Sequence, residues 1–292
     1  MLRLAVICDP NALRPTALAV ESALSHATGP VELIVVGLDF AASDWARLDR
    51  MVASFPQTIL TRIDFDISQL GDAGAVSAHI SRATFARLFL HRLVDGVVLY
   101  MDGDVLVTGD LSRLKPQALA GQPIAAVPDF VVQKWCARRN GFRRRTALQK
   151  LRRWAEYSGD PARYFNAGVI LMDMPAIRAD AGLVAALEDV ATASGYPLGD
   201  QDHLNRVFQN RATLIDPAWN CSWGRLHRQR SLMAKAGLPM APPSDLAIIH
   251  YHGPNKPWKK LGWRKNWPRW PQIQRYRRAL RAFNARYLDL AF

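Results

Sequence analysis

Two aspartates separated by one glycine, Asp102 and Asp104, lie between apolar runs in GVVLYMDGDVLV (96–107). Alternate residues of an extended segment project from the same face, so both carboxylates can converge on one hard divalent cation. Burying the two charges without such a partner would be costly. A solvated turn is the alternative, because Asp and Gly favour turns, but the flanking apolar runs favour a metal site.

Two histidines at alternate positions, His250 and His252, follow another apolar run in IIHYHGPNKPW (248–258). They offer a third metal ligand, and imidazole suits Mn²⁺ better than Mg²⁺, which prefers an all-oxygen shell. The alternative is that His250 is a hydrogen-bonded core residue and His252 a surface residue of the loop.

Further polar residues accompany other apolar segments. Asp200, Gln201 and Asp202 open an amphipathic helix in PLGDQDHLNRVF (197–208), and helix capping accounts for only one of them. Asn166 and a glycine interrupt the buried strand YFNAGVILMDM (164–174), which indicates close approach by a ligand. By contrast, Arg82 and Arg87 in RATFARLFL (82–90) are typical of exposed, salt-bridging arginines.

These residues require a scaffold of strands alternating with helices. Such alternation predicts one α/β domain with a largely parallel sheet and a basic C-terminal appendage. Ligands of such sheets bind beyond the carboxyl ends of the strands, where Asp9, Asn11, Asp102 and Asp104 fall. The expected strands are 2–8, 31–38, 96–101, 122–128 and 164–174, and the expected helices are 12–26, 43–54, 82–93 and 176–193.

The net charge of +13 is concentrated in two segments. Nine bases and no acid lie in 134–153, and eleven bases with one acid, Asp289, lie in 256–292. Such localised charge indicates a polyanionic partner: nucleic acid, anionic lipid or a phosphorylated substrate. The segment 134–153 is predicted either to cap a substrate cleft and meet phosphates there or to be a mobile exposed helix.

Other sequence features exclude several classes of protein. The three cysteines are widely spaced, which predicts neither a disulfide framework nor a zinc site and favours a reducing, cytoplasmic setting. No apolar stretch is long enough for a membrane-spanning helix. The sequence argues against a dinucleotide-dependent dehydrogenase, because no Gly-x-Gly-x-x-Gly follows a strand.

The tail 258–292 contains four tryptophans among basic residues. Apolar residues at helical spacing then oppose an arginine face, which predicts an amphipathic helix on an anionic membrane surface. These apolar residues are Ile273, Tyr276, Leu280, Phe283 and Tyr287. The alternative is that Trp258 and Trp263 pack on the main domain, 1–257, and that the arginines are solvated. Nothing else in the chain supports a nucleic-acid partner.

Five motifs together resemble glycosyltransferase family 8, whose bacterial lipopolysaccharide galactosyl- and glucosyltransferases are most similar, and which includes glycogenin. The resemblance covers roughly residues 2–270 and implies a Rossmann-like GT-A fold, a UDP-sugar donor and retention of anomeric configuration. Phe85 stands in place of a usual tyrosine. The motifs are AHISRATFARL (78–88), YMDGDVLV (100–107), YFNAGVILMD (164–173), GDQDHLN (199–205) and HYHGPNKPW (250–258).

The resemblance also implies roles for individual residues. The metal ligands would be Asp102, Asp104 and His250, holding Mn²⁺ with Mg²⁺ as the alternative. Nucleotide contacts would come from Ile7, Asp9, Asn11, Gly103, Gly253 and Lys256, although Ala12 stands where the family has a stacking aromatic. Donor-sugar contacts would come from His79, Arg87, Asn166, Asp200 and Gln201, of which Gln201 and Asp200 are the catalytic candidates.

We therefore expect a metal-dependent UDP-hexose transferase that acts on lipopolysaccharide or another cell-surface glycan. It would be cytoplasmic and peripheral on the inner membrane. A haloacid-dehalogenase-type phosphatase also uses Asp-x-Asp with a metal, but Leu106 stands where such enzymes usually place a hydroxyl residue. A noncatalytic, membrane-bound sugar-nucleotide binder is the other alternative.

Overall fold

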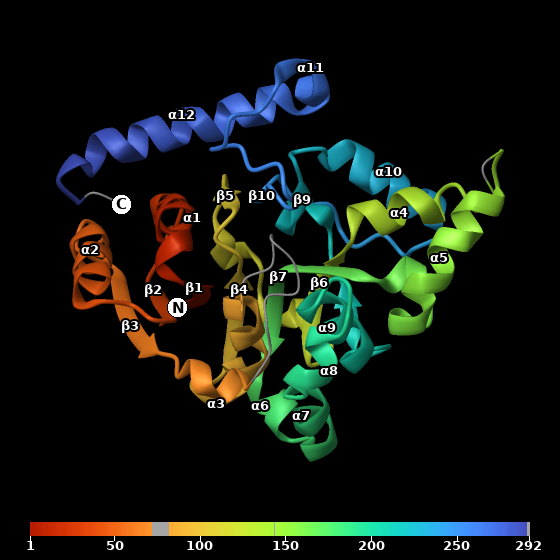
Figure 1. Cartoon of the computed structure of the whole chain (residues 1–292), viewed down its shortest axis with the longest axis horizontal. Helices are drawn as coiled ribbons and strands as arrows, with labels where there is room; N and C mark the ends of the chain where they lie inside the picture. Colours follow the sequence, from red (N-terminus) through yellow and green to blue (C-terminus); the bar gives the residue numbers. More distant parts are fainter. Residues whose placement is uncertain (72–81, 143, 291–292) are drawn as a thin grey trace.

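The computed structural model describes residues 1–71, 82–142 and 144–290. His79 therefore lies outside the described residues. A seven-stranded sheet in the order β3-β2-β1-β4-β7-β6-β8 forms the centre of the molecule (Figure 1). All neighbouring strands are parallel except β7, which is antiparallel to both β4 and β6. The predicted, largely parallel α/β sheet is thus confirmed. Its strands are β1 (Leu2–Cys8), β2 (Val31–Gly37), β3 (Thr58–Asp64), β4 (Val97–Met101), β6 (Ile124–Pro128), β7 (Phe165–Asp173) and β8 (Ala212–Leu214).

A smaller sheet brings the C-terminal third of the chain to the aspartate pair. It has the order β5-β10-β9, with β5 (Val105–Val107), β10 (Ile248–His250) and β9 (Cys221–Ser222). His250 is paired with Val105 across the antiparallel β5–β10 ladder. The next amide, Tyr251 N–H, donates to the carbonyl of Asp104 at 2.9 Å. Backbone pairing thereby fixes residue 250 beside residue 104.

The helices differ from the expected ones in two places. The helix expected over 176–193 is three short helices, because Asp173, Asp180 and Asp189 each cap a new helical N-terminus. Residues 82–89 form a 3-10 helix, which precedes α3. The α-helices are α1 (Leu13–Ser25), α2 (Ala42–Val52), α3 (Leu90–Leu93), α4 (Phe130–Cys136), α5 (Arg144–Ser158), α6 (Met174–Arg178), α7 (Ala181–Leu187), α8 (Val190–Ser194), α9 (Asp200–Val207), α10 (Leu226–Ala236), α11 (Trp263–Asn266) and α12 (Trp270–Arg286).

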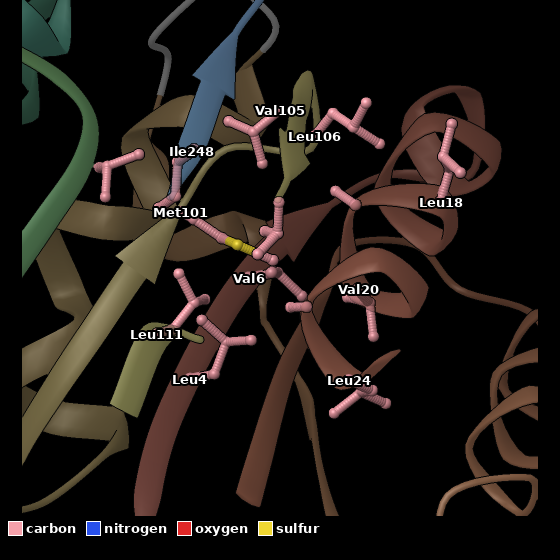
Figure 2. Close-up of a cluster of buried hydrophobic side chains, with 14 of the residues drawn as sticks. Leu4, Val6, Leu18, Val20, Leu24, Met101, Val105, Leu106, Leu111 and Ile248 are labelled. Atoms are coloured by element: carbon pink, nitrogen blue, oxygen red, sulfur yellow. The ribbon is translucent and has the colours of Figure 1, made fainter. Parts of the chain in front are cut away.

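Alternating side chains of the central strands supply two hydrophobic clusters. Leu4 and Val6 of β1 belong to one cluster, whereas Ala5 and Ile7 belong to the other. Figure 2 shows part of the first cluster, where side chains from α1, β1, β4, β5 and β10 come together. This packing holds the carboxyl ends of β1 and β4 in fixed positions relative to the small sheet.

The C-terminal helix α12 completes the first cluster, which corrects the prediction that its apolar side lies against lipid. Ile273, Tyr276 and Phe283 are almost fully buried within this cluster. Arg286 donates to Glu21 of α1 at 2.6 Å, and α12 lies across α1 (Figure 1). A protein core and a lipid interface select the same helical periodicity, so the pattern alone could not distinguish them.

The segment before α12 has a different environment. Trp263 and Trp267 are 55% and 64% exposed, respectively, and their rings are 5.9 Å apart. Trp258, by contrast, packs against Tyr276 with ring centroids 5.4 Å apart. Within the described residues, no helix combines the length and apolar character needed to cross a bilayer.

Candidate active site

The predicted site residues gather where the order of the central sheet reverses. From β1 the chain builds outward through β2 and β3, and then returns to place β4 on the other side of β1. Ligands of open α/β sheets bind at such a switch point, outside the carboxyl ends of the strands. Asp9 follows β1 there, and Asp102 follows β4.

Asp102, Asp104 and His250 converge as predicted. Each offers one ligand atom, and these atoms all lie within 4.8 Å of one another. His250 Nε2 is 3.1 Å from Asp104 Oδ1 and 3.8 Å from Asp102 Oδ2. His252 takes no part in this group, because it pairs with Ser222 Oγ at 2.7 Å. Burial lowers the pKa of His252 to about 3, so its ring is neutral.

The orientation of the His250 ring is set from behind. His250 Nδ1 lies 2.9 Å from the side-chain oxygen of Asn220, which can only accept, so Nδ1 carries the proton. The lone pair of Nε2 therefore faces the two carboxylates, as a metal ligand requires. Gly168 makes room for this arrangement: a Cβ atom there would lie 2.2 Å from His250 Cε1 and 2.8 Å from Asp102 Oδ2.

Cationic side chains surround the carboxylates. Buried Arg87 donates to Asp102 Oδ1 at 2.8 Å, and its Nε lies 3.0 Å from Asp200 Oδ2. Burial favours the neutral form of Arg87, but the two carboxylates outweigh it and raise the pKa of the guanidinium. Lys256 contacts Asp104 Oδ2. Burial alone would raise the pKa of Asp104, but Lys256, and His250 when its ring is protonated, lower it well below its usual range.

The residues present fit a divalent metal. Asp104 Oδ1 is buried and, within the described parts of the chain, accepts no hydrogen bond. The Nε2 lone pair of His250 faces the same oxygen, so neither atom donates a hydrogen to the other. Two carboxylates and one neutral imidazole form a mixed oxygen and nitrogen donor set, which suits Mn²⁺ better than Mg²⁺. A cation bound between them would satisfy that oxygen and the Nε2 lone pair together.

The predicted donor-sugar residues that the structure describes, all but His79, form one hydrogen-bonded network with the candidate metal ligands. The Gln201 side-chain oxygen accepts from Asn166 Nδ2 at 3.0 Å and from Ala167 N–H at 3.1 Å. Gln201 Nε2 donates to Tyr164 Oη at 3.3 Å. Asn166 Oδ1 accepts from Asn220 Nδ2 at 2.9 Å, and Asn220 also holds His250. A chain of amides thus runs from His250 to Gln201.

Asp200 has an acidity suited to a change of protonation near neutral pH. Burial raises its pKa to about 6; the Arg87 guanidinium opposes this rise, and the Asp102 carboxylate adds to it. Arg87 was expected to be an exposed salt-bridging residue, but it is buried because it serves both carboxylates. Arg82 donates instead to the carbonyl of Gly71, outside this network.

The remaining predicted residues lie around the carboxyl ends of β1 and β4 and in the loop after β10. Ile7 is buried at the end of β1, and Asn11 is exposed in the turn that follows. Asp9 Oδ1 accepts from Ala12 N–H at 3.0 Å. Gly103 packs against α1, where a Cβ atom would lie 2.1 Å from Thr16 Oγ1. Gly253 lies with Lys256 in the loop after β10.

Asp129 and Asn220 belong to the network but were missed in the sequence. Asp129 follows the predicted strand 122–128, so its position carried the same signal as Asp9 and Asp102. Its carboxylate accepts from Asn166 Nδ2 at 3.2 Å and from two backbone amides of α4. Asn220 carried no such signal, because it reaches the site from a short 3-10 helix.

Comparisons with known proteins agree with this geometry. The family model described as "Glycosyl transferase family 8" matches residues 3–262. Glycosyltransferase GlyF of Streptococcus pneumoniae is 27% identical over 257 residues, which cover 87% of this chain and 56% of GlyF. Lipopolysaccharide 1,2-glucosyltransferase of Escherichia coli is 27% identical over 208 residues, which cover 68% of this chain and 54% of that enzyme. The chain therefore spans little more than half the length of these two relatives.

The solved structures show the fold. The galactosyltransferase LgtC, crystallised with donor and acceptor sugar analogues, superposes with a TM-score of 0.72 at 21% identity. The superposition covers 97% of this chain and 96% of LgtC. The apo structure of the bifunctional glycosyltransferase WbbM superposes with a TM-score of 0.65, covering 93% of this chain and 49% of WbbM. A GT-A-like fold with a C-terminal helical tail follows from these likenesses.

Proposed function

The chain belongs to glycosyl transferase family 8, and from this premise we propose that it transfers a hexose from a UDP-sugar to a glycan acceptor. The hexose is galactose or glucose, the configuration is retained, and the acceptor is lipopolysaccharide or another surface glycan. One observation carries the proposal: a divalent-cation donor set is joined by hydrogen bonds to polar residues placed to hold a sugar.

Asp102, Asp104 and His250 would hold Mn²⁺. When bound, the metal neutralises the two phosphates of the donor and stabilises the charge that builds on the UDP leaving group. The protein residues do the positioning. Lys256, from the loop after β10, contacts Asp104 and would be available to bind a phosphate oxygen of the donor when Asp104 serves as a metal ligand. The carboxyl end of β1, with Asp9 and Asn11, is placed for the nucleoside.

Retention calls either for a protein nucleophile or for attack on the face that the leaving group occupies. Gln201 is an amide and a poor nucleophile, and three polar contacts hold its side chain in place. The Asp200 carboxylate is engaged by Arg87. We therefore favour front-face substitution: the acceptor oxygen bonds to the anomeric carbon as the carbon–phosphate-oxygen bond breaks, and the departing phosphate takes the hydroxyl proton. The amide of Gln201 steadies the positive charge on the sugar.

The mechanism is tested with a slow, fluorinated UDP-sugar and intact-protein mass spectrometry. We expect no covalent glycosyl adduct on the wild-type protein during turnover. An adduct that maps to Asp200 would overturn front-face substitution and establish a double displacement instead.

The proposed function itself is tested by UDP release from a panel of UDP-sugars with Mn²⁺, Mg²⁺ or EDTA. We expect release from one hexose donor with Mn²⁺, lost with EDTA and lowered about 10³-fold or more by Asp104→Asn. Asp245→Asn, on a side chain that is 89% exposed, is the matched control and should retain activity. UDP binding without turnover of any donor would instead indicate a noncatalytic sugar-nucleotide binder, and phosphatase activity alone a hydrolase.

We also propose that the enzyme works at the inner face of the membrane through the segment before α12. Exposed Trp263 and Trp267 lie among Arg264, Lys265 and other cations, a combination suited to anionic headgroups. Because α12 belongs to the core, removing the tail would unfold the protein and would not test the membrane contact. The test is flotation of a Trp263→Ser/Trp267→Ser variant with phosphatidylglycerol liposomes; flotation equal to wild type would refute this membrane contact.

A further inference from the structure

Five cations form a separate group between α4, α10 and the start of α12. We call this group the cation cluster; it consists of Lys134, Arg138, Arg225, Arg228 and Arg269. Three of its members, Lys134, Arg138 and Arg228, line a cavity of about 390 Å³ between α4 and α10, together with Lys235. The predicted basic segment 134–153 thus contributes two of these side chains from α4 and the turn after it.

Among the described residues, no carboxylate neutralises the cation cluster. In the described parts of the chain, none of its five members forms an ion pair, although seventeen such contacts occur elsewhere in the molecule. Neutral partners hold the guanidinium groups instead. Arg225 donates to Ser222 O at 3.1 Å and to Ser222 Oγ at 2.7 Å, and it stacks 3.9 Å from the Phe130 ring centroid. Arg269 stacks 4.7 Å from Trp223.

The cations disfavour one another. Burial lowers the pKa of Lys134, and four arginines of the cluster lower it further. Burial likewise lowers the pKa of Arg225 to about 10, with added repulsion from Arg269 and Arg228. Like charges held together by neutral partners cost free energy, which a bound anion would recover.

The cation cluster lies beside the catalytic centre, on the side away from the nucleoside. Phe130 directly follows Asp129, whose carboxylate accepts from Asn166. Ser222, which holds Arg225, also pairs with His252. In Figure 1, α4 and α10 lie across β4 and β10 from β1 and α1, where the nucleoside would bind. The side that carries α4 and α10 is therefore left for the approach of the acceptor.

We propose that the cation cluster binds a phosphate or similar anionic group carried by the acceptor, so that the acceptor is an anionic glycan. This inference rests on the proposed function, because it places the donor on the opposite side of the metal ligands. It also assigns a use to the α4 end of the basic segment 134–153. Guanidinium groups suit a phosphate because each can donate two parallel hydrogen bonds to its oxygens.

The test compares a charged and a neutral sugar on the full-length protein with UDP and Mn²⁺ filling the donor site. Calorimetry would measure the affinities of glucose 6-phosphate and glucose for wild type and for Lys134→Gln/Arg138→Gln/Arg228→Gln. We expect wild type to prefer the phosphate form about tenfold or more and the triple variant to lose that preference, as the loss of charged hydrogen bonds predicts. The matched control is Arg275→Gln/Arg278→Gln/Arg281→Gln on the exposed side of α12.

Each other outcome overturns the proposal. These outcomes are equal affinity of wild type for the two sugars, or an equal loss of preference in the control. Phosphatidylglycerol vesicles and a single-stranded oligonucleotide are tested alongside. If the cluster variant loses only one of these, the cations serve lipid or nucleic acid and not the acceptor. UDP binding and UDP release, measured separately, report on the donor site, so failure of the proposed function is distinguishable.

Discussion

The catalytic centre and the cation cluster lie side by side but treat charge in opposite ways. In the centre, Asp102 and Asp200 share Arg87, and Asp104 contacts Lys256. In the cation cluster, arginines rest on Ser222, Phe130 and Trp223, and no acid neutralises them within the described residues.

This difference indicates which kind of ligand each region would bind. The centre is organised before any ligand arrives, because its charges and amides already hold one another in place. The buried Asp104 Oδ1, which accepts no hydrogen bond from the described residues and lies beside Asp102 and His250, marks the position for a cation. The cluster is fixed by neutral contacts and retains an excess of positive charge, which marks a position for an anion.

Of the substitutions proposed below, Gly168→Ala should disrupt the geometry of the catalytic centre most severely. The added methyl would collide with His250 and Asp102, so either the ring or the strand must shift. Misplacement of about 1 Å at a reacting centre lowers activity about 10²-fold, and we expect at least that loss in UDP release together with weaker Mn²⁺ binding. Gly29→Ala, where nothing lies within 4 Å of the new atom, is the control. Normal turnover in Gly168→Ala would contradict the geometry of the centre.

The raised pKa of Asp200 should make the stability of the folded protein depend on pH. The folded protein holds this proton up to a pKa of about 6, whereas the unfolded chain releases it near 3.8. The stabilisation is therefore complete below about pH 4 and is lost as pH rises through about 6; its full size is roughly 3 kcal/mol. Urea unfolding in EDTA at pH 4 to 7 should show this slope in wild type and not in Asp200→Asn. Parallel pH profiles would argue against burial of the charge.

Asn220→Ala tests whether the organisation extends beyond the ligands themselves. The variant would remove the acceptor that fixes the His250 Nδ1 proton, and such losses weaken metal affinity about 10- to 100-fold. Titration of Mn²⁺ against donor-dependent UDP release gives the affinity, with exposed Asn140→Ala as the control. Unchanged Mn²⁺ dependence would mean that His250 orients itself without help.

Salt gives the mildest separation of the two regions. Exposed charges are screened at physiological ionic strength far more than buried ones. Raising NaCl from about 50 to about 200 mM should therefore increase KM for the acceptor a few-fold and change KM for the donor less. If both constants rise together, or if the acceptor constant does not move, the cation cluster does not act through charge on the acceptor.

Much of the scaffold could be predicted because its signals are local. Runs of apolar residues located β1, β2, β4, β6 and β7, and polar residues at the strand ends located the candidate metal ligands. The places of Asn220 and Asp129 in the site could not be predicted in this way. They depend on contacts with Asn166, which lies far away along the chain and outside any short window of sequence.

The C-terminal tail shows the other limit of sequence reasoning. An amphipathic pattern states that one side of a helix is apolar but not what covers it. For α12 the cover is the core beside α1, with Tyr276 and Phe283 buried there. The prediction of a lipid contact is therefore confined to Trp263 and Trp267.

The packing of α12 on α1 has a consequence for the order in which the protein is made. Residues 13–25 leave the ribosome well before residues 270–286, which cover them in the folded protein. At about 5 to 20 residues per second, the apolar surface near α1 waits tens of seconds for its partner. The nascent chain is then exposed to aggregation, and a chaperone that shields α1 during synthesis should raise the yield of folded enzyme.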